Sequence, residues 1–321
     1  MQFIRKILSK LSNSPILTTP PLRPLLWEDD IARHNNSNAP FMNVMSPAEI
    51  ELSEYQKSYL WKVLNLSDEA FLRYRDADTL PMPTTSDREG YNRGADRDYF
   101  VGGLIDFLYV QEVATQYDLK PQSYLDFGCA SGRVLRQFAL HSKIPDLWGA
   151  DINGRHIKFI QEHLPQSIKA IHNSAIPYFP VADDRIDLVT AFSVFTHIDT
   201  FESAWLAEIY RVMTPGALCY LTIHNDDTWN NLWCEQEKEF LYARLKYADN
   251  NIEKHRDQPI PAGRTSFRDT QIGPYRAQTF HSNDYIYANW GRFFDILEIR
   301  PFAHGRNQAV VVARKNRKAR G

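Results

Sequence analysis

"SYLDFGCASGRVL", residues 123–135, begins as a strand and ends as a helix. Its first five residues are mostly apolar, as in a buried strand, and residues 132–141 have the spacing of a helix. Small residues lie between the two, Gly128, Ala130 and Gly132 among them. Small residues cost backbone entropy and lose packing area. This composition at a strand-to-helix corner indicates that something approaches the backbone closely.

Strand and helix patterns alternate from residue 120 to the end of the chain. We expect strands at 123–127, 146–152, 168–173, 185–195, 217–224, 293–300 and 308–315, and helices at 132–141, 154–164 and 201–213. Asp199 and Glu202 are expected to cap the last of these helices. Such alternation predicts an α/β fold, a Rossmann-like, doubly wound and mainly parallel sheet with helices on both faces. Ligands bind such sheets at the carboxyl ends of the strands, where the corner lies.

Length and composition bound the remaining choices. The chain has 321 residues, 43% of them hydrophobic, which is enough for a substantial core. A net charge of −2 provides no field that attracts nucleic acid or anionic membrane. Three cysteines without paired spacing favour a reducing compartment, so we expect a cytoplasmic protein. No apolar run is long enough to span a membrane, and residues 1–11 make a poor secretory signal.

The chain is expected to divide near residue 95. Residues 1–95 form a proline-rich arm followed by helices that begin at Ser46 and Ser67. Residues 1–11 are either a frayed helix or a basic amphipathic helix on a membrane surface. A further helix is expected at 100–117. The main domain then covers 96–315, with an aromatic-rich insertion at 225–290 and a basic tail at 316–321 that we interpret as a solvated end.

The corner itself favours one class of ligand. It lacks the GxGxxG spacing of a dinucleotide site, and the Asp126 carboxylate would repel a diphosphate. A carboxylate suits a ligand that bears an ammonium group, such as the amino-acid end of S-adenosylmethionine. Asp151 ends the second strand, where an acidic side chain accepts hydrogen bonds from ribose hydroxyls. The alternative for Asp151 is that it only caps the next helix.

Several segments together resemble a known family. "YLDFGCASGR", "ADI", "PVADDRIDLVTAFSVFTHI", "EIYRVMTPGALCYLTIH" and "QAVVVARK" are similar to the class I S-adenosylmethionine-dependent methyltransferases, especially bacterial members with "SVFTH" after strand four. The resemblance covers about residues 95–315 and implies a seven-stranded sheet with an antiparallel last strand. It also implies S-adenosyl-L-methionine as the cofactor.

The resemblance places the cofactor on named residues. The residues implied for the methionine part are Asp126, Gly128, Cys129, Ala130 and Gly132. Asp151 would hold the ribose and Ile152 would pack on adenine; Asn173 and Ser174 would lie near the adenine amino group, and Phe192 and Ser193 beneath the cofactor. This chain departs from the family at two of these positions. Ala130 replaces a glycine, which alanine tolerates only where φ is not positive, and Asn173 replaces an acid but still offers an amide oxygen.

Methyl transfer to a hydroxyl needs alignment of the acceptor and a base that takes its proton. His197 follows strand four and His224 ends strand five, so both are candidate catalytic residues at the reactive end of the cofactor. The alternative for His197 is a capping or packing residue. Asp226 and Asp227 could assist through a metal ion, but adjacent aspartates are more typical of a solvated loop or a helix cap, and we expect no metal.

The insertion at 225–290 is expected to cover the acceptor site. Its aromatic side chains either present faces to a sugar or planar ring, or fill a small core of their own. Arg264, Arg268 and Arg276 are candidates for binding a phosphate or carboxylate. Residues 261–276 are polar and contain glycine, as in a mobile lid.

We therefore expect an enzyme that moves a methyl group from S-adenosylmethionine to a hydroxyl of a small molecule or glycan, with no nucleic-acid partner and no stable membrane insertion. Two alternatives remain. One is a methyltransferase acting on nitrogen or on a protein side chain. The other is a non-catalytic module that binds partners through residues 1–95. An NAD enzyme is disfavoured because GxGxxG is missing.

Overall fold

The computed structural model describes residues 40–89, 94–234, 241–268, 277–305 and 307–316. Seven strands form one sheet in the order β3-β2-β1-β4-β5-β9-β8. They are β1 (Ser123–Phe127), β2 (Asp146–Asp151), β3 (Ile168–His172), β4 (Ile186–Ala191), β5 (Met213–Ile223), β8 (Phe294–His304) and β9 (Gln308–Lys315). The pairs from β3 to β5 are parallel, and β9 runs antiparallel to both β5 and β8. The predicted fold class is confirmed, including the antiparallel last strand.

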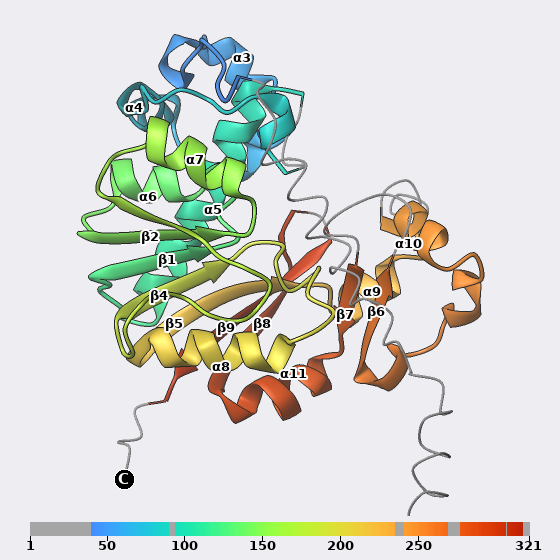
Figure 1. The fold of residues 1–321 in the computed structure, drawn as a ribbon. Helices are drawn as coiled ribbons and strands as arrows, with labels where there is room; N and C mark the ends of the chain where they lie inside the picture. The colour runs from blue at the N-terminus through green and yellow to red at the C-terminus, as the bar shows by residue number, and fades with distance from the viewer. Residues whose placement is uncertain (1–39, 90–93, 235–240, 269–276, 306, 317–321) are drawn as a thin grey trace, which may run out of the picture.

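Helices cover both faces of this sheet (Figure 1). On one face lie α5 (Asp96–Gln116), α6 (Leu135–His141) and α7 (Gly154–His163); on the other lie α8 (Glu202–Val212) and α11 (Asn283–Asn289). Side chains of β1 alternate between the two cores, as the period of a strand requires. Tyr124 packs with the α5 and α6 side, whereas Leu125 and Phe127 pack with Trp205 of α8.

The residues before α5 pack onto the α5 and α6 face. They contain η1 (Pro47–Glu49), α3 (Leu52–Gln56), η2 (Trp61–Val63), α4 (Asp68–Ala77) and η3 (Thr85–Asp87). Tyr55 and Phe71 are fully buried there and meet the ring of Phe100 edge-on. The prediction of one continuous helix from Ser46 is wrong, because the segment forms the short helices η1, α3 and η2 instead. The Tyr55 hydroxyl donates to the Pro47 carbonyl at 2.7 Å, and this hydrogen bond joins α3 to η1.

The insertion between β5 and β8 has its own small core. It contains α9 (Asp226–Asn231), α10 (Ala243–Ala248), η5 (Ile252–His255), η6 (Pro261–Gly263), η7 (Trp290–Arg292) and a hairpin of β6 (Arg264–Arg268) and β7 (Ala277–His281). Trp229, Phe267 and Phe280 pack together in it. Of the alternatives for the aromatic side chains, these three therefore follow the one in which they fill a local core.

Several expected segments lie outside the described residues: the arm up to residue 39, Arg276, and residues 317–321 of the tail. None of the helices in the described part of the chain reaches the length and apolar character that crossing a bilayer requires.

Candidate active site

The corner after β1 turns sharply because three residues adopt positive φ. Gly128 has φ 74°, Ala130 has φ 44° and Gly132 has φ 84°. The amides of Gly128 and Cys129 donate to the Ala150 carbonyl at 2.7 and 3.1 Å, which ties the corner to the end of β2. The corner therefore lies at the carboxyl edge of the two central strands.

Packing within the chain accounts for both glycines. A Cβ atom on Gly128 would lie 2.3 Å from Cγ2 of Val194, and one on Gly132 would lie 2.6 Å from Cδ1 of Leu164. Any side chain would also be strained at these φ values. What approaches the corner so closely is thus the protein itself, and the evidence for a ligand must come from the polar groups around the corner.

Ala130 contradicts one expectation. Alanine was expected there only if φ were not positive, yet the residue is left-handed. A left-handed conformation costs a non-glycine residue about 1–2 kcal/mol. The Ala130 amide donates to Oδ2 of Asp151 at 2.7 Å, and this charge-assisted hydrogen bond offsets the cost.

Asp126, the penultimate residue of β1, carries a buried carboxyl group. The Thr190 hydroxyl donates to Oδ1 at 3.0 Å, and Tyr124 in turn contacts Thr190 at 2.7 Å. Burial raises the pKa of Asp126 to about 7, against the opposing effects of the Thr190 hydrogen bond and the Arg133 charge. A cationic group nearby would favour the ionised form, so this site suits an ammonium group.

A small hollow opens beside the corner. We call it the corner hollow, and it is lined by Arg88, Tyr99, Asp126, Gly128, Cys129, Ala130, Arg133, Val134 and Phe192. Five of these residues are expected cofactor residues. The other four were not identified from the sequence. Arg133 directly follows the last corner glycine, which was the available clue.

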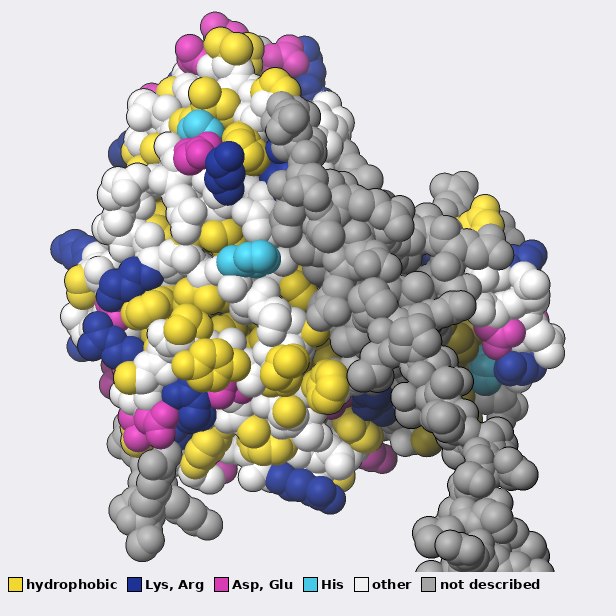
Figure 2. Space-filling view, viewed as in Figure 1, with side chains coloured by type: hydrophobic (Ala, Val, Ile, Leu, Met, Phe, Trp, Pro, Cys, Tyr) yellow, Lys and Arg dark blue, Asp and Glu magenta, His cyan; other side chains and the backbone are white. Residues whose placement is uncertain are grey.

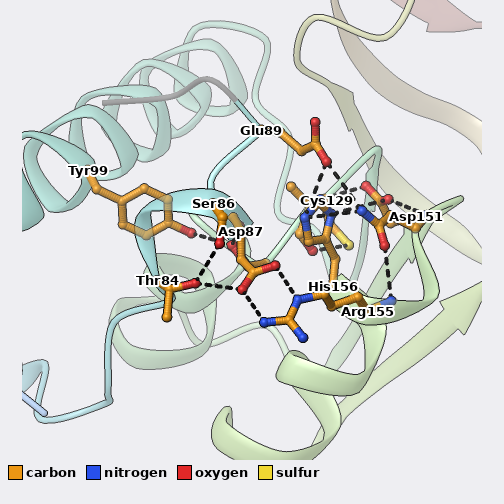
Figure 3. Close-up of polar contacts among 12 residues, drawn as sticks. Thr84, Ser86, Asp87, Glu89, Tyr99, Cys129, Asp151, Arg155 and His156 are labelled. Carbon is orange, nitrogen blue, oxygen red and sulfur yellow. Dashed lines mark hydrogen bonds and ion pairs between the residues drawn. The ribbon is translucent and has the colours of Figure 1, made fainter. Parts of the chain in front are cut away.

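Asp151 joins the corner to the start of α7 (Figure 3). Its Oδ2 accepts from the Ala130 amide, and its Oδ1 accepts from the Asn153 amide at 2.8 Å. Asn153 is the N-cap of α7, because its side chain accepts from the Arg155 amide. The capping alternative for Asp151 is therefore wrong. Each carboxylate oxygen can accept more than one hydrogen bond, so the group retains acceptor capacity for ribose hydroxyls.

His156 lies between Asp151 and Glu89 and contacts both (Figure 3). Nδ1 of His156 lies 3.6 Å from Asp151 Oδ1, and Nε2 lies 3.3 Å from Glu89 Oε1. Burial disfavours a charged imidazole, but the Asp151 and Glu89 carboxylates outweigh it and raise the pKa of His156.

Asn173 supplies the most direct sign of an absent partner. Its backbone N–H donates to the Asp151 carbonyl at 3.1 Å, and its side-chain Nδ2 donates to the Ser174 carbonyl at 2.9 Å. Its Oδ1 is buried without a hydrogen-bond partner among the described residues. A buried acceptor of this kind costs free energy unless a donor arrives. The amino group of an adenine is such a donor, so the residues present fit the nucleoside of S-adenosylmethionine.

The remaining expected cofactor residues lie around this edge. Ile152 follows Asp151, and its carbonyl contacts Nε2 of His172 at 3.0 Å. Ser174 is exposed. Phe192 is buried at the end of β4, and Ser193 has φ 57° and donates its amide to the Thr222 hydroxyl at 2.7 Å.

His197 and His224 lie where β7 of the insertion meets the carboxyl ends of β4 and β5. We call this contact the seam. The His281 amide donates to the His224 carbonyl at 2.9 Å, and Nδ1 of His197 donates to the Ala277 carbonyl at 2.8 Å. That hydrogen bond leaves the lone pair on Nε2 of His197. Burial lowers the pKa of His197 to about 4, and burial likewise lowers the pKa of His224 well below its usual value.

Two expectations about charged residues are wrong. Arg264 forms an ion pair with Glu202, and Arg268 forms one with Asp199. These ion pairs therefore join the insertion to the start of α8 and to the residues just before it, and they occupy the arginine side chains that were expected to bind a phosphate or carboxylate. The same pairs explain why Asp199 and Glu202 do not cap α8, whose N-cap is Phe201.

The two aspartates for which a metal role was considered, Asp226 and Asp227, form hydrogen bonds within the chain. Asp226 accepts from the Asn283 amide at 2.7 Å, and Asp227 accepts from Nδ2 of Asn225 at 2.7 Å. Among the residues described, no three His, Cys, Asp or Glu side chains are grouped as metal ligands.

Comparison with known proteins agrees with this geometry. The family model described as "Methyltransferase domain" matches residues 125–221, from the corner to β5. No curated protein matches the chain. Residues 125–221 therefore match a methyltransferase domain, and the sheet order with its antiparallel β9 gives the Rossmann-like fold in which this stretch lies.

Solved structures of similar fold come from several organisms. One is the 1,6-didemethyltoxoflavin-N1-methyltransferase of Burkholderia thailandensis with bound 1,6-didemethyltoxoflavin and S-adenosylhomocysteine, at 12% identity, TM-score 0.46, and coverage of 72% of this chain and 87% of that one. A methyltransferase from Methanosarcina mazei shows 20% identity and TM-score 0.43, covering 64% and 98%. Another from Aquifex aeolicus shows 13% identity and TM-score 0.41, covering 64% and 89%.

Proposed function

We propose that this chain transfers a methyl group from S-adenosylmethionine to a hydroxyl group of a small molecule or glycan. The observation that carries the cofactor part is the unpartnered Oδ1 of Asn173 beside Asp151, at the edge that Asp126 and the corner also border. Bound there, S-adenosylmethionine supplies an electrophilic methyl group on a sulfonium. Four of the five residues expected for its methionine part, all except Gly132, line the corner hollow. The residues expected for its nucleoside are Asp151, which accepts from the Ala130 amide, and residues near it.

The chain's own residues would then position an acceptor and take its proton. We assign Nε2 of His197 as the atom that takes the proton of the acceptor hydroxyl. The hydrogen bond from Nδ1 to the Ala277 carbonyl fixes the tautomer in which Nε2 has the lone pair. His224, just after the end of β5, would help to hold the seam at which His197 lies, because its carbonyl accepts from the His281 amide. The likeness of "SVFTH", residues 193–197, to bacterial members of the class supports a hydroxyl acceptor.

Surface features agree with a small-molecule partner. On the face drawn in Figure 2, Lys and Arg side chains are scattered among acidic and apolar ones and form no basic patch of the kind that binds nucleic acid. Cys129 and Cys219 are buried free thiols and Cys234 is an exposed one, which supports a cytoplasmic location.

The first prediction concerns cofactor binding. Asp151→Asn should weaken binding of S-adenosylhomocysteine by about 10- to 100-fold, because the amide loses charge-assisted hydrogen bonds to the ribose. Isothermal calorimetry measures this directly. Asp146→Asn, at the other end of β2 and paired with Lys169 and Arg185, is the matched control and should bind normally. Equal affinity of the two variants would contradict the ribose assignment, and no binding by the wild type would favour a non-catalytic module.

The second prediction concerns His197. Once an acceptor has been found by radioactive methyl uptake across sugar, nucleotide-sugar and phenolic compounds, His197→Gln should lower kcat by about 100-fold. Glutamine can still donate to the Ala277 carbonyl, so the seam should persist and cofactor affinity should not change. The wild-type rate should stay level above about pH 5 and fall as pH drops through about 4, where Nε2 becomes protonated. Full turnover by the variant would remove the base assignment.

A further inference from the structure

A buried imidazole connects the expected ribose acid to a segment outside the sheet. His156, in the first turn of α7, has only 1% of its surface exposed. Its Nδ1 lies 3.6 Å from Oδ1 of Asp151, and its Nε2 lies 3.3 Å from Oε1 of Glu89 (Figure 3). Glu89 belongs to the segment between α4 and α5. The imidazole therefore links the residues before the sheet to the carboxyl end of β2.

The two carboxylates determine which form of the His156 ring fits between them. An ionised carboxylate only accepts hydrogen bonds, and a neutral imidazole has one N–H and one lone pair. A neutral ring would direct its lone pair at one of the two carboxylates, whereas the doubly protonated ring presents an N–H to each. Burial lowers the pKa of His156, but the carboxylates of Asp151, Glu89 and Asp87 outweigh burial and raise it.

The fold holds the Glu89 carboxylate at the start of α7. Nδ2 of Asn153 donates to Oε1 of Glu89 at 3.3 Å. Two residues before Glu89, Asp87 forms a bidentate ion pair with Arg155 of α7 at 2.6 and 2.8 Å. Glu89 itself has φ 44°, a left-handed conformation that a residue other than glycine keeps only where its surroundings hold it. Its partner for His156 is thus supplied by a fixed backbone.

The Asp151 carboxylate has backbone donors on one side and the imidazole on another. Its Oδ2 accepts from the Ala130 amide at 2.7 Å, and its Oδ1 accepts from the Asn153 amide at 2.8 Å. Nδ1 of His156 is buried and has no hydrogen-bond partner among the described residues, and Asp151 Oδ1 lies in ion-pair contact with it. A binding group whose orientation is fixed beforehand loses less entropy when its ligand arrives.

We propose that Glu89 and His156 are positioning residues for the cofactor. Glu89 fixes the His156 ring, and the ring fixes the Asp151 carboxylate in the orientation that receives the ribose hydroxyls. This inference rests on the proposed function, because it assumes that Asp151 binds the ribose of S-adenosylmethionine. Glu89, from outside the methyltransferase sheet, then affects cofactor affinity through two other side chains.

A double-mutant cycle tests whether Glu89 acts through Asp151. In calorimetry with S-adenosylhomocysteine, Glu89→Ala should weaken binding by about 10-fold, but by less than about twofold in the Asp151→Asn background. Glu89→Gln should recover part of the loss, because its amide oxygen still accepts from Nε2 of His156. Glu162→Ala is the control. It removes an exposed carboxylate of α7, 3.8 Å from Lys158, and should bind normally.

The ionisation of the His156 ring gives a second measurement. Nuclear magnetic resonance of the ring should show a pKa above the usual value of about 6.5 in the wild type and a lower pKa in Glu89→Ala. The charged groups around the ring are Asp151 on β2, Glu89 and Asp87 before α5, and Arg155, whose charge Asp87 balances. Loss of Glu89 removes one of the carboxylates that favour the charged ring.

Each result bears on one part of the proposal. A loss of affinity that depends on Asp151, together with the lowered pKa of His156, supports it. Equal weakening in both backgrounds means that Glu89 does not act through Asp151. Normal affinity of Glu89→Ala, or a pKa of His156 that this variant leaves unchanged, means that Asp151 needs no support from this pair. Any of these three results overturns the proposal and leaves the proposed function standing. If the wild type does not bind S-adenosylhomocysteine, the proposed function fails and this inference fails with it.

Discussion

Replacing Asp78 with alanine should lower the free energy of unfolding by about 3–5 kcal/mol, because the change leaves Arg136 as an unpaired charge in the core. Both side chains are fully buried, and Asp78 accepts from Nε and Nη2 of Arg136 at 2.8 and 2.6 Å. Arg136 also donates to the carbonyls of Leu80 and Pro81 at 2.8 and 3.1 Å. The pair therefore fixes the start of residues 78–89, the segment between α4 and α5, on α6. Urea unfolding of the full chain at neutral pH measures the effect.

Two further variants test the reason for this loss. Asp76→Ala removes an exposed carboxylate two residues earlier, and it should change stability by less than about 0.5 kcal/mol. The double variant Asp78→Leu with Arg136→Met removes both charges, and it should be much less destabilised than Asp78→Ala. If the double variant were as unstable as the single one, loss of packing rather than an unpaired charge would be the cause.

Residues 78–89, between α4 and α5, show what the sequence could not reveal. Prolines and polar residues dominate this segment, so its sequence shows neither a helical nor a strand pattern. Its contacts are with Arg136, Ser131 and Arg155, which lie about 45 to 70 residues away along the chain. Pattern and spacing describe neighbours along the chain, whereas an ion pair between distant segments depends on the fold. Residues 78–89 are therefore the segment about whose contacts the sequence pattern predicts least and the structure adds most.

The sheet was predictable for the opposite reason. Buried parallel strands are short apolar runs, and the intervening helices have an apolar stripe, so each element can be recognised from its own residues. Asp151 follows from the same logic, since it ends a recognisable strand. The seam was harder to predict from the sequence. His197 and His224 were expected at the rim and are found there, but their contacts with β7 follow from an insertion whose path the sequence did not specify.

Glu202 should be the other residue on which stability depends most. Its carboxylate accepts from Nε1 of Trp290 at 2.6 Å and contacts Nε2 of His281 at 3.1 Å, and it forms an ion pair with Arg264. These partners come from η7, β7 and β6, so a single carboxylate joins the insertion to α8. Glu202→Ala should cost about 3–5 kcal/mol at pH 7, because it leaves the buried donors of Trp290 and His281 and the partly buried Arg264 without their acceptor.

The pH dependence of Glu202 gives a sharper test. Burial opposes ionisation, but the His281 hydrogen bond and charge, together with Arg264, lower the pKa of Glu202 to about 2. A carboxyl group whose pKa is lowered on folding stabilises the protein above its unfolded pKa of about 4.5, and that contribution is lost as pH falls toward the folded value. It amounts to about 3 kcal/mol.

The difference in unfolding free energy between the wild type and Glu202→Gln should therefore be constant from about pH 7 to pH 5 and then narrow steadily as pH falls toward 2. Urea unfolding across this range measures it. Glu253→Gln, a change at an exposed ion pair with Arg256, should show almost no difference at any pH. A gap for Glu202→Gln that did not narrow below about pH 4.5 would mean that shape and packing, not the charge of Glu202, hold the insertion on α8.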